Sequence, residues 1–140
     1  MQKMGGFTLL ELLIVMIILG ILAALSIPVY QNHATKAYKQ EAFTTLQGAK
    51  ESAVRYKSVK GSFSNMTLAN MDFDPNAVMG GQLRHFDYTV GDVTANTFTV
   101  TAACVDTAGV DKAAVVNCNP ANDTVLIKET GDITCAGKFL

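Results

Sequence analysis

Residue types that carry catalysis or metal binding are scarce in this chain of 140 residues. It has no tryptophan, two histidines (His33 and His85) and three cysteines, which form no C-x-x-C pair and have no histidine beside them. That pattern argues against a structural zinc site and against a thioredoxin-type redox motif. The sequence also lacks a G-x-S-x-G elbow, a P-loop and an H-E-x-x-H motif. We therefore expect no enzyme activity, no metal, no cofactor, and surface positions for both histidines.

Charge of one sign is not concentrated in any block. Residues 31–60 hold six basic and two acidic side chains, whereas residues 61–140 hold nine acidic and four basic ones. The basic residues are interleaved with alanine, tyrosine and leucine along a predicted helix, which is unlike a nucleic-acid-binding patch. Nucleic acid is therefore not expected to be the main ligand.

Charged and amide side chains are nearly missing from Phe7 to Ile27, where Glu11 is the one ionisable residue. About 20 apolar residues at a rise of about 1.5 Å each cross a hydrocarbon core of about 30 Å. The segment therefore predicts a transmembrane helix. A cleaved signal peptide, with "ALS" before Ile27 as its cleavage site, is the competing interpretation. Its apolar core would be longer than usual and would contain an acid.

Glu11 needs an explanation because an ionised acid inside a bilayer is unfavourable unless it is paired or lies near the surface. The preceding "MQKMGG" is short and polar, and cleavage between Gly6 and Phe7 would create a cationic amine one helical turn before Glu11. In a bundle of identical helices Glu11 would meet the amine of Phe7 on the next chain, and the pair would favour one axial register. Alternatively, Glu11 satisfies its own helix start or the helix dipole.

The stretch "GGFTLLELLIVMIILGILAALSIPVY" resembles the N-terminal signature of type IV pilins and the related pseudopilins. The resemblance implies that a prepilin peptidase cuts after Gly6 and methylates Phe7. It also implies that Glu11 neutralises the terminal amine of a neighbouring subunit. Pro28 is where the long helix of that family commonly kinks, and a proline removes one backbone donor and clashes with the preceding turn.

The charges on either side of the apolar segment favour the opposite orientation in the membrane. Lys3 stands alone before the apolar segment, whereas His33, Lys36 and Lys39 follow it. The positive-inside rule by itself would place the C-terminal part in the cytoplasm. The leader motif is more specific than a charge count, and three cysteines fit an oxidising compartment better. We therefore expect the C-terminal part outside.

After Pro28 the pattern becomes amphipathic and predicts a helix to about Lys57, stopped by Gly61 and Ser62. Its apolar face recurs at helical spacing: Ala34, Tyr38, Ala42, Leu46, Ala49, Ala53 and Tyr56. Residues 61–83 contain many turn formers and predict a long connecting loop.

Alternation then predicts an antiparallel meander of three or four strands, packed on the apolar face of the helix. The strands are expected around Phe86–Val90, Phe98–Ala102, Thr124–Lys128 and Ile133–Cys135. A disulfide between Cys104 and Cys118 would close an exposed loop, and pairing of Cys118 with Cys135 is nearly as plausible.

We therefore expect an α+β chain in four parts: a leader (1–6), a transmembrane and assembly helix (7–28), an amphipathic helix (29–60) and a head (61–140). The resemblance implies a pilus subunit, made in the bacterial inner membrane and then exported into an extracellular filament that serves adhesion, motility or secretion. Its partners would be membrane lipid, the prepilin peptidase, the inner-membrane assembly machinery and copies of itself. A minor pilin, a type II secretion pseudopilin, or an anchored adhesin or sensor that never polymerises are the alternatives.

Overall fold

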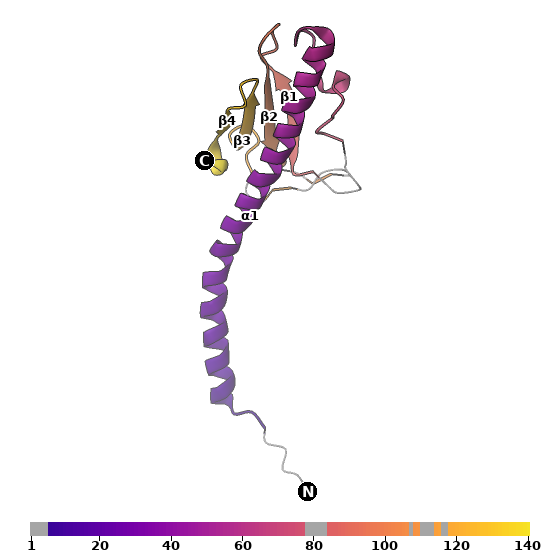
Figure 1. The fold of residues 1–140 in the computed structure, drawn as a ribbon. Coiled ribbons are helices and arrows are strands. Elements are labelled where there is room, and N and C mark those ends of the chain that lie inside the picture. Colours follow the sequence, from indigo (N-terminus) through magenta and orange to yellow (C-terminus); the bar gives the residue numbers. More distant parts are fainter. Residues whose placement is uncertain (1–5, 78–83, 107, 110–113, 116–117) are drawn as a thin grey trace. The chain divides into compact units, whose positions relative to one another are not determined.

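The computed structural model describes residues 6–77, 84–106, 108–109, 114–115 and 118–140, with Pro28 described by its backbone alone. The chain separates into two compact units, one ending at Ala34 and the other running from Thr35 to Leu140. The elements are α1 (Leu9–Lys60), the 3₁₀ turn η1 (Leu68–Asn70), β1 (Phe86–Gly91), β2 (Thr99–Cys104), β3 (Thr124–Lys128), β4 (Ile133–Cys135) and the 3₁₀ turn η2 (Gly137–Phe139). The four strands form an antiparallel meander in the order β1-β2-β3-β4, which confirms the α+β fold class (Figure 1).

Helix α1 continues through Pro28 without interruption, and the kink expected there stays a prediction. The helix ends at Lys60 because Gly61 adopts a left-handed conformation with φ +80°. The Gly61 N–H donates to the Lys57 carbonyl at 2.7 Å. Lys57 and Lys60 in the last turn also complement the negative end of the helix dipole.

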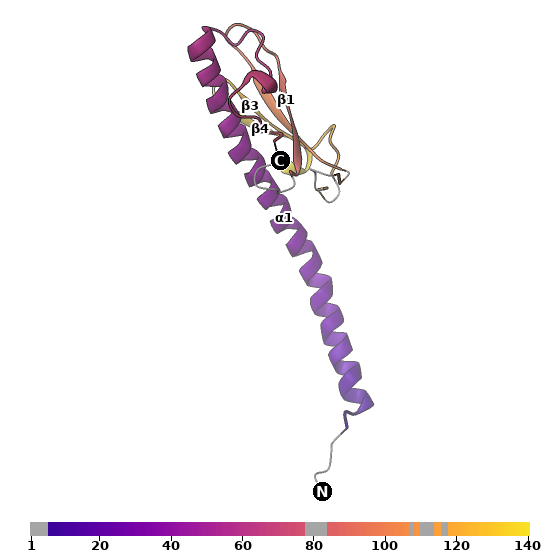
Figure 2. The same cartoon turned by 90° about the vertical axis from the view of Figure 1, so that its right-hand side faces the viewer.

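The C-terminal half of α1 lies along one face of the sheet (Figure 2). Ala42, Leu46, Ala49 and Ala53 have no exposed surface, as their spacing predicts. These side chains belong to the same buried apolar cluster as residues of the strands. The largest fully buried side chains that complete this core are Phe86, Phe98, Val100, Val125, Ile127 and Phe139.

The outer edge of β1 is capped by a side chain. The Asn76 amide accepts from the Tyr88 N–H at 2.9 Å and donates to the Tyr88 carbonyl at 2.9 Å. Asn76 therefore satisfies both backbone groups of Tyr88, as a neighbouring strand would. An occupied edge is less able to pair with the sheet of another molecule.

The loop between Cys104 and Cys118 departs from the expectation that it is exposed. Val105 and Val115 are buried, and the Val115 N–H donates to the Val105 carbonyl at 2.8 Å. These two valines pack inward at the ends of the loop, so the expectation is wrong for them. Much of the rest of the loop lies outside the described residues.

A disulfide joins Cys104 to Cys118 across a Cα–Cα distance of 6.1 Å, and Cys135 is a free, half-buried thiol. The bridge ties the end of β2 to the segment that leads into β3. It therefore holds the buried valines of the loop against the sheet.

Replacing Cys104 and Cys118 together by serine is expected to lower the free energy of unfolding by about 3 kcal/mol, because the bridge closes a loop with a sequence separation of 14 residues. Cys135→Ser is the matched control and should change the stability much less. Urea unfolding of the full chain in detergent, followed by near-UV circular dichroism, measures both. If Cys135→Ser lowered the free energy of unfolding as much as the double variant does, that result would contradict the observed pairing.

The segment between α1 and β1 is anchored to the helix through Asp72. Arg55 contacts both Asp72 carboxylate oxygens, with Nε–Oδ2 at 2.6 Å and Nη2–Oδ1 at 3.1 Å. The buried Ser52 hydroxyl donates to the same carboxylate and accepts from the Phe73 N–H at 3.2 Å. The Arg55 and Ser52 hydrogen bonds lower the pKa of Asp72 to about 2.

The Asp72 anchor is expected to weaken as pH falls from about 4 to about 2, because a carboxylate with a lowered folded-state pKa stabilises the fold above its unfolded-state pKa. Asp72→Asn should therefore speed hydrogen exchange of the Phe73 amide at pH 6 and have a much smaller effect near pH 2. The ratio of variant to wild-type rates at each pH cancels the intrinsic pH dependence of exchange.

Asp74→Asn is the control, since Asp74 is exposed and accepts from the Asn76 N–H at 2.9 Å. A ratio for Asp72→Asn that stays constant over the whole pH range would refute the role given to the Asp72 charge.

Candidate assembly site

The predicted cleavage point lies in an exposed, non-helical stretch directly before α1. Gly6, Phe7 and Thr8 precede the first helical residue, and Phe7 is 86% exposed. A side chain placed at Gly6 would meet no atom within 4 Å. The backbone there is open to a protease, although cleavage after Gly6 and methylation of Phe7 remain predictions.

Glu11 and Thr8 form a reciprocal cap at the start of α1. The Glu11 carboxylate accepts from the Thr8 N–H at 3.0 Å and from the Thr8 hydroxyl at 2.9 Å. In return, the Glu11 N–H donates to the Thr8 hydroxyl oxygen at 3.2 Å. This is a capping box, with threonine at the N-cap position and glutamate three residues later. In the single chain Glu11 therefore binds its own helix start, the alternative that the sequence left open.

The helix surface that follows is apolar and exposed. The large apolar side chains from Leu9 to Ile27 are each about half exposed or more. The one helix of the described chain that is long and apolar enough to cross a membrane is α1, in its N-terminal part. Ser26 is polar, but its hydroxyl donates to the Leu22 carbonyl at 2.7 Å and so is satisfied within the helix. This surface has no partner within the first unit and needs lipid or other apolar helices to cover it.

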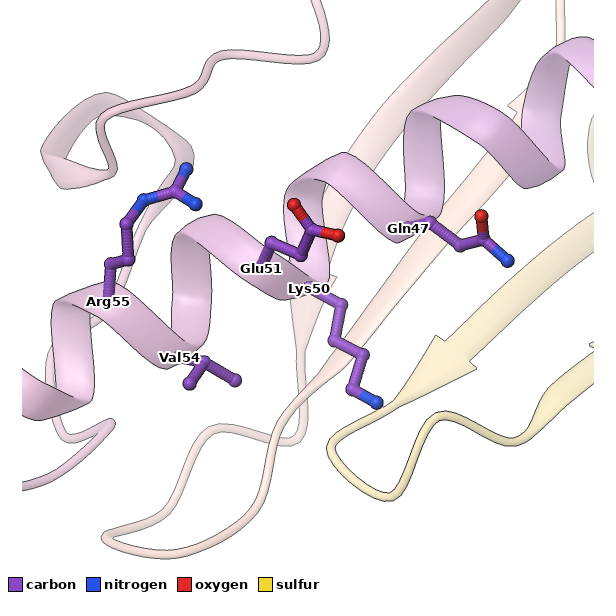
Figure 3. A pocket seen from close by; sticks show the side chains of 5 residues that line it. All are labelled: Gln47, Lys50, Glu51, Val54 and Arg55. Atoms are coloured by element: carbon purple, nitrogen blue, oxygen red, sulfur yellow. The ribbon is translucent and has the colours of Figure 1, made fainter.

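The second unit has a shallow groove on the flank of α1, lined by Gln47, Lys50, Glu51, Val54 and Arg55 (Figure 3). Figure 3 shows Lys50 reaching away from Glu51 toward the turn between β3 and β4. Its ammonium lies so close to Gly131 that a side chain at that glycine would collide with it. The lining residues include no histidine or cysteine, and in the described part of the chain no group of three or more His, Cys, Asp or Glu could hold a metal.

One polar contact was missed by the sequence analysis. His85 is half-buried, and its Nδ1 lies 2.7 Å from Glu41 Oε2, while its ring packs on Tyr38 at a centroid distance of 4.8 Å. The pair joins α1 to the residue before β1. Expecting a surface histidine was wrong for His85, whereas His33 is exposed. No sequence pattern signals this pair, because its members are 44 positions apart.

Comparison with known proteins identifies two family models along the chain. One, described as "Prokaryotic N-terminal methylation motif", matches residues 1–27. The other, described as "Type IV minor pilin ComP, DNA uptake sequence receptor", matches residues 28–121. The boundary between them falls at Pro28, at the end of the apolar stretch.

Curated relatives are pilus proteins. Type IV major pilin protein PilE1 of Neisseria gonorrhoeae is 36% identical over 91 residues, which cover 64% of this chain and 55% of that protein. Fimbrial protein EcpC of Eikenella corrodens is 45% identical over 60 residues, which cover 43% of this chain and 39% of that protein. The chain thus spans about half the length of the curated relatives it matches, or less.

A solved structure shares the fold. The crystal structure of the non-core minor pilin PilV of Neisseria meningitidis matches with a TM-score of 0.55 at 21% identity, over 76% of this chain and 90% of that one. The likeness shows the arrangement of a long helix with an antiparallel sheet. Since the second family model covers more than half of the sequence and the first covers the N-terminal motif, the chain belongs to the type IV pilin family, in the group described as "Type IV minor pilin ComP, DNA uptake sequence receptor".

Proposed function

We propose that this chain is a structural, non-catalytic subunit of a type IV pilus. A precursor in the bacterial inner membrane is cut after Gly6 by a prepilin peptidase, methylated at Phe7, and passed by the inner-membrane assembly machinery into a filament outside the cell. The observation that carries the proposal is the exposed apolar surface of residues 9–27 with one carboxylate, Glu11, at its beginning. The match of residues 1–27 to the methylation motif supports it.

Assembly then requires Glu11 to change partners. In the single chain the carboxylate is held by two neutral donors of Thr8. A processed neighbour offers a cationic amine, and charge-assisted hydrogen bonds are roughly twice as strong as neutral ones. A subunit in the wrong axial register would leave both charges unpaired, so the exchange favours one register. The apolar side chains supply the packing, and Glu11 selects the position.

Within the pilus we propose the role of a minor subunit. The family model that covers residues 28–121 is described as a minor pilin, and it matches the second half of α1 and most of the head. The curated relatives include major pilins, but the alignments with them cover 55% and 51% of the length of those proteins.

Glu11→Gln removes the charge and is expected to abolish incorporation into pili while the protein still accumulates in the membrane. Glu51→Gln is the matched control, an exposed acid on the same helix that is far from the apolar segment. Immunoblots of sheared pili and of membrane fractions from the producing bacterium measure both, with the mass of the N-terminal peptide as a check of processing. The expected mature peptide begins at methylated Phe7.

Two results would overturn this proposal. Normal amounts of the Glu11→Gln protein in sheared pili would favour an anchored adhesin or sensor that never polymerises. A mature protein that begins at Ile27 would favour an ordinary signal peptide.

A second candidate function is binding of double-stranded DNA, which is favoured by the match to a family described as a DNA uptake sequence receptor. DNA binding depends on cations that neutralise phosphates. Several cations of the second unit are engaged internally, since Arg55 contacts Asp72 and Lys57 donates to Asn96 at 3.2 Å. We therefore propose that any such binding uses few phosphate contacts and depends on base sequence.

Fluorescence anisotropy of the full chain in detergent, titrated into labelled genomic duplexes and scrambled duplexes of equal length, tests this function. We expect tighter binding to a subset of genomic sequences and a weak salt dependence, with a slope of log K against log salt of about −2 to −3. Equal affinity for genomic and scrambled duplexes, or a steep slope for both, would contradict sequence-dependent reception of DNA.

A further inference from the structure

Two lysines at the beginning of the second unit, Lys36 and Lys39, make no hydrogen bond or ion pair with the part of the chain that the structure describes. Lys36 and Lys39 are three positions apart on α1, so their side chains are neighbours on one flank of the helix. Lys36 is exposed, and the Lys39 ammonium lies 5.7 Å from the centre of the Phe43 ring. Within the described residues neither lysine has a hydrogen bond or an ion pair.

Two lysines farther along the helix, Lys50 and Lys57, do contact the head. Lys50 lies against Gly131, and Lys57 donates to Asn96 and lies 4.7 Å from the centre of the Phe63 ring. These contacts direct the distal ammonium groups onto the head. Among the described residues no contact of Lys36 or Lys39 with the head is seen, and the ring that Lys39 contacts, Phe43, belongs to the same helix.

The helix itself offers the two lysines no free acid. The sequence contains no Asp or Glu between Glu11 and Glu41, and Glu41 is committed to His85 at 2.7 Å. Residues 12–40 therefore carry net positive charge at their C-terminal end. The positive-inside rule does not account for these cations, because the proposed topology places them outside.

We propose that Lys36 and Lys39 bind the headgroups of anionic phospholipids at the outer surface of the membrane before the subunit enters the filament. The inference rests on the proposed function, which places residues 9–27 in the bilayer. Lys36 follows Ile27 by nine positions, about 13 Å along a helix. The headgroup region adds about 5–8 Å beyond the hydrocarbon core on each side.

Lysine side chains in a helix tilt toward its N-terminus and extend their charged ends into the interface. The tilt brings the Lys36 ammonium back toward the headgroups. Lys39 lies about one turn farther, within a Debye length of about 8 Å, and so still feels the negative surface charge. The chemistry that fits this pair is a lipid phosphate, which Lys36 would bind and which Lys39 would approach on leaving the Phe43 ring.

The full chain reconstituted into phosphatidylcholine vesicles tests this inference. Spin-labelled phosphatidylglycerol and spin-labelled phosphatidylcholine, compared by electron paramagnetic resonance, give the relative affinity for the anionic lipid. We expect a preference for phosphatidylglycerol that falls by roughly fivefold for each lysine removed at low salt. Lys36→Gln/Lys39→Gln should bring it near unity, and Lys36→Arg/Lys39→Arg should retain it.

The matched control is Lys60→Gln/Lys128→Gln, which removes the same charge from exposed positions elsewhere in the second unit. An equal loss in this control, or no loss in Lys36→Gln/Lys39→Gln, would overturn the lipid contact. A preference that vanishes on dilution of the protein would instead assign the lysines to a second copy. Release of the wild-type chain from vesicles by alkaline washing would overturn the proposed membrane anchor itself, whereas retention without lipid preference would overturn this inference alone.

Discussion

The dominant constraint on this molecule is that a carboxylate placed in hydrocarbon must have a partner. Glu11 has one in the single chain, the N-cap residue Thr8, and this cap uses donors that every helix start leaves unsatisfied. Under the proposed function, the cap would make the precursor tolerable in a membrane without making Glu11 unavailable. Because Thr8 offers neutral donors, the cationic chain end that cleavage after Gly6 would create would be the better partner. The same residue would therefore suit both proposed states, membrane-bound and polymerised.

The two halves of α1 meet different requirements with the same backbone geometry. Before Pro28 the helix is apolar on all sides, which suits lipid or a bundle of similar helices. After Thr35 one face, mostly alanine with Leu46, is buried in the core of the head, while other positions carry charge. A substitution such as Ala49→Leu would be harmless to the first requirement and damaging to the second, since Ala49 has no exposed surface.

Periodicity predicted the elements of the fold because it records which face is buried. The strand alternation at Phe86, Tyr88 and Val90 and the helical spacing of Ala42, Leu46 and Ala49 are properties of single segments. The contacts that lock these segments together were not predictable in this way. Arg55 with Asp72 and Glu41 with His85 join residues from different elements, and each side chain alone looks like an ordinary surface residue. Asn76 likewise resembles a turn former until β1 lies beside it. At the N-terminus the motif singled out Gly6, Phe7 and Glu11 as candidates. The hydrogen bonds between Thr8 and Glu11 could be found only in the structure.

The basic residues of α1 show why a charge count is a poor measure of what a surface can bind. Residues 31–60 contain six basic side chains, and a count from the sequence treats all six as equally available to a ligand. In the structure Arg55 is neutralised by Asp72, and Lys57 is directed onto the head. Lys36 and Lys39, at the beginning of the segment, have no hydrogen bond or ion pair among the described residues, and Lys60 is exposed at its end. Attraction to anionic groups should therefore be strongest where two such lysines are neighbours, at Lys36 and Lys39. Any recognition of a polyanion by the head must in consequence depend on shape and hydrogen bonding more than on net charge.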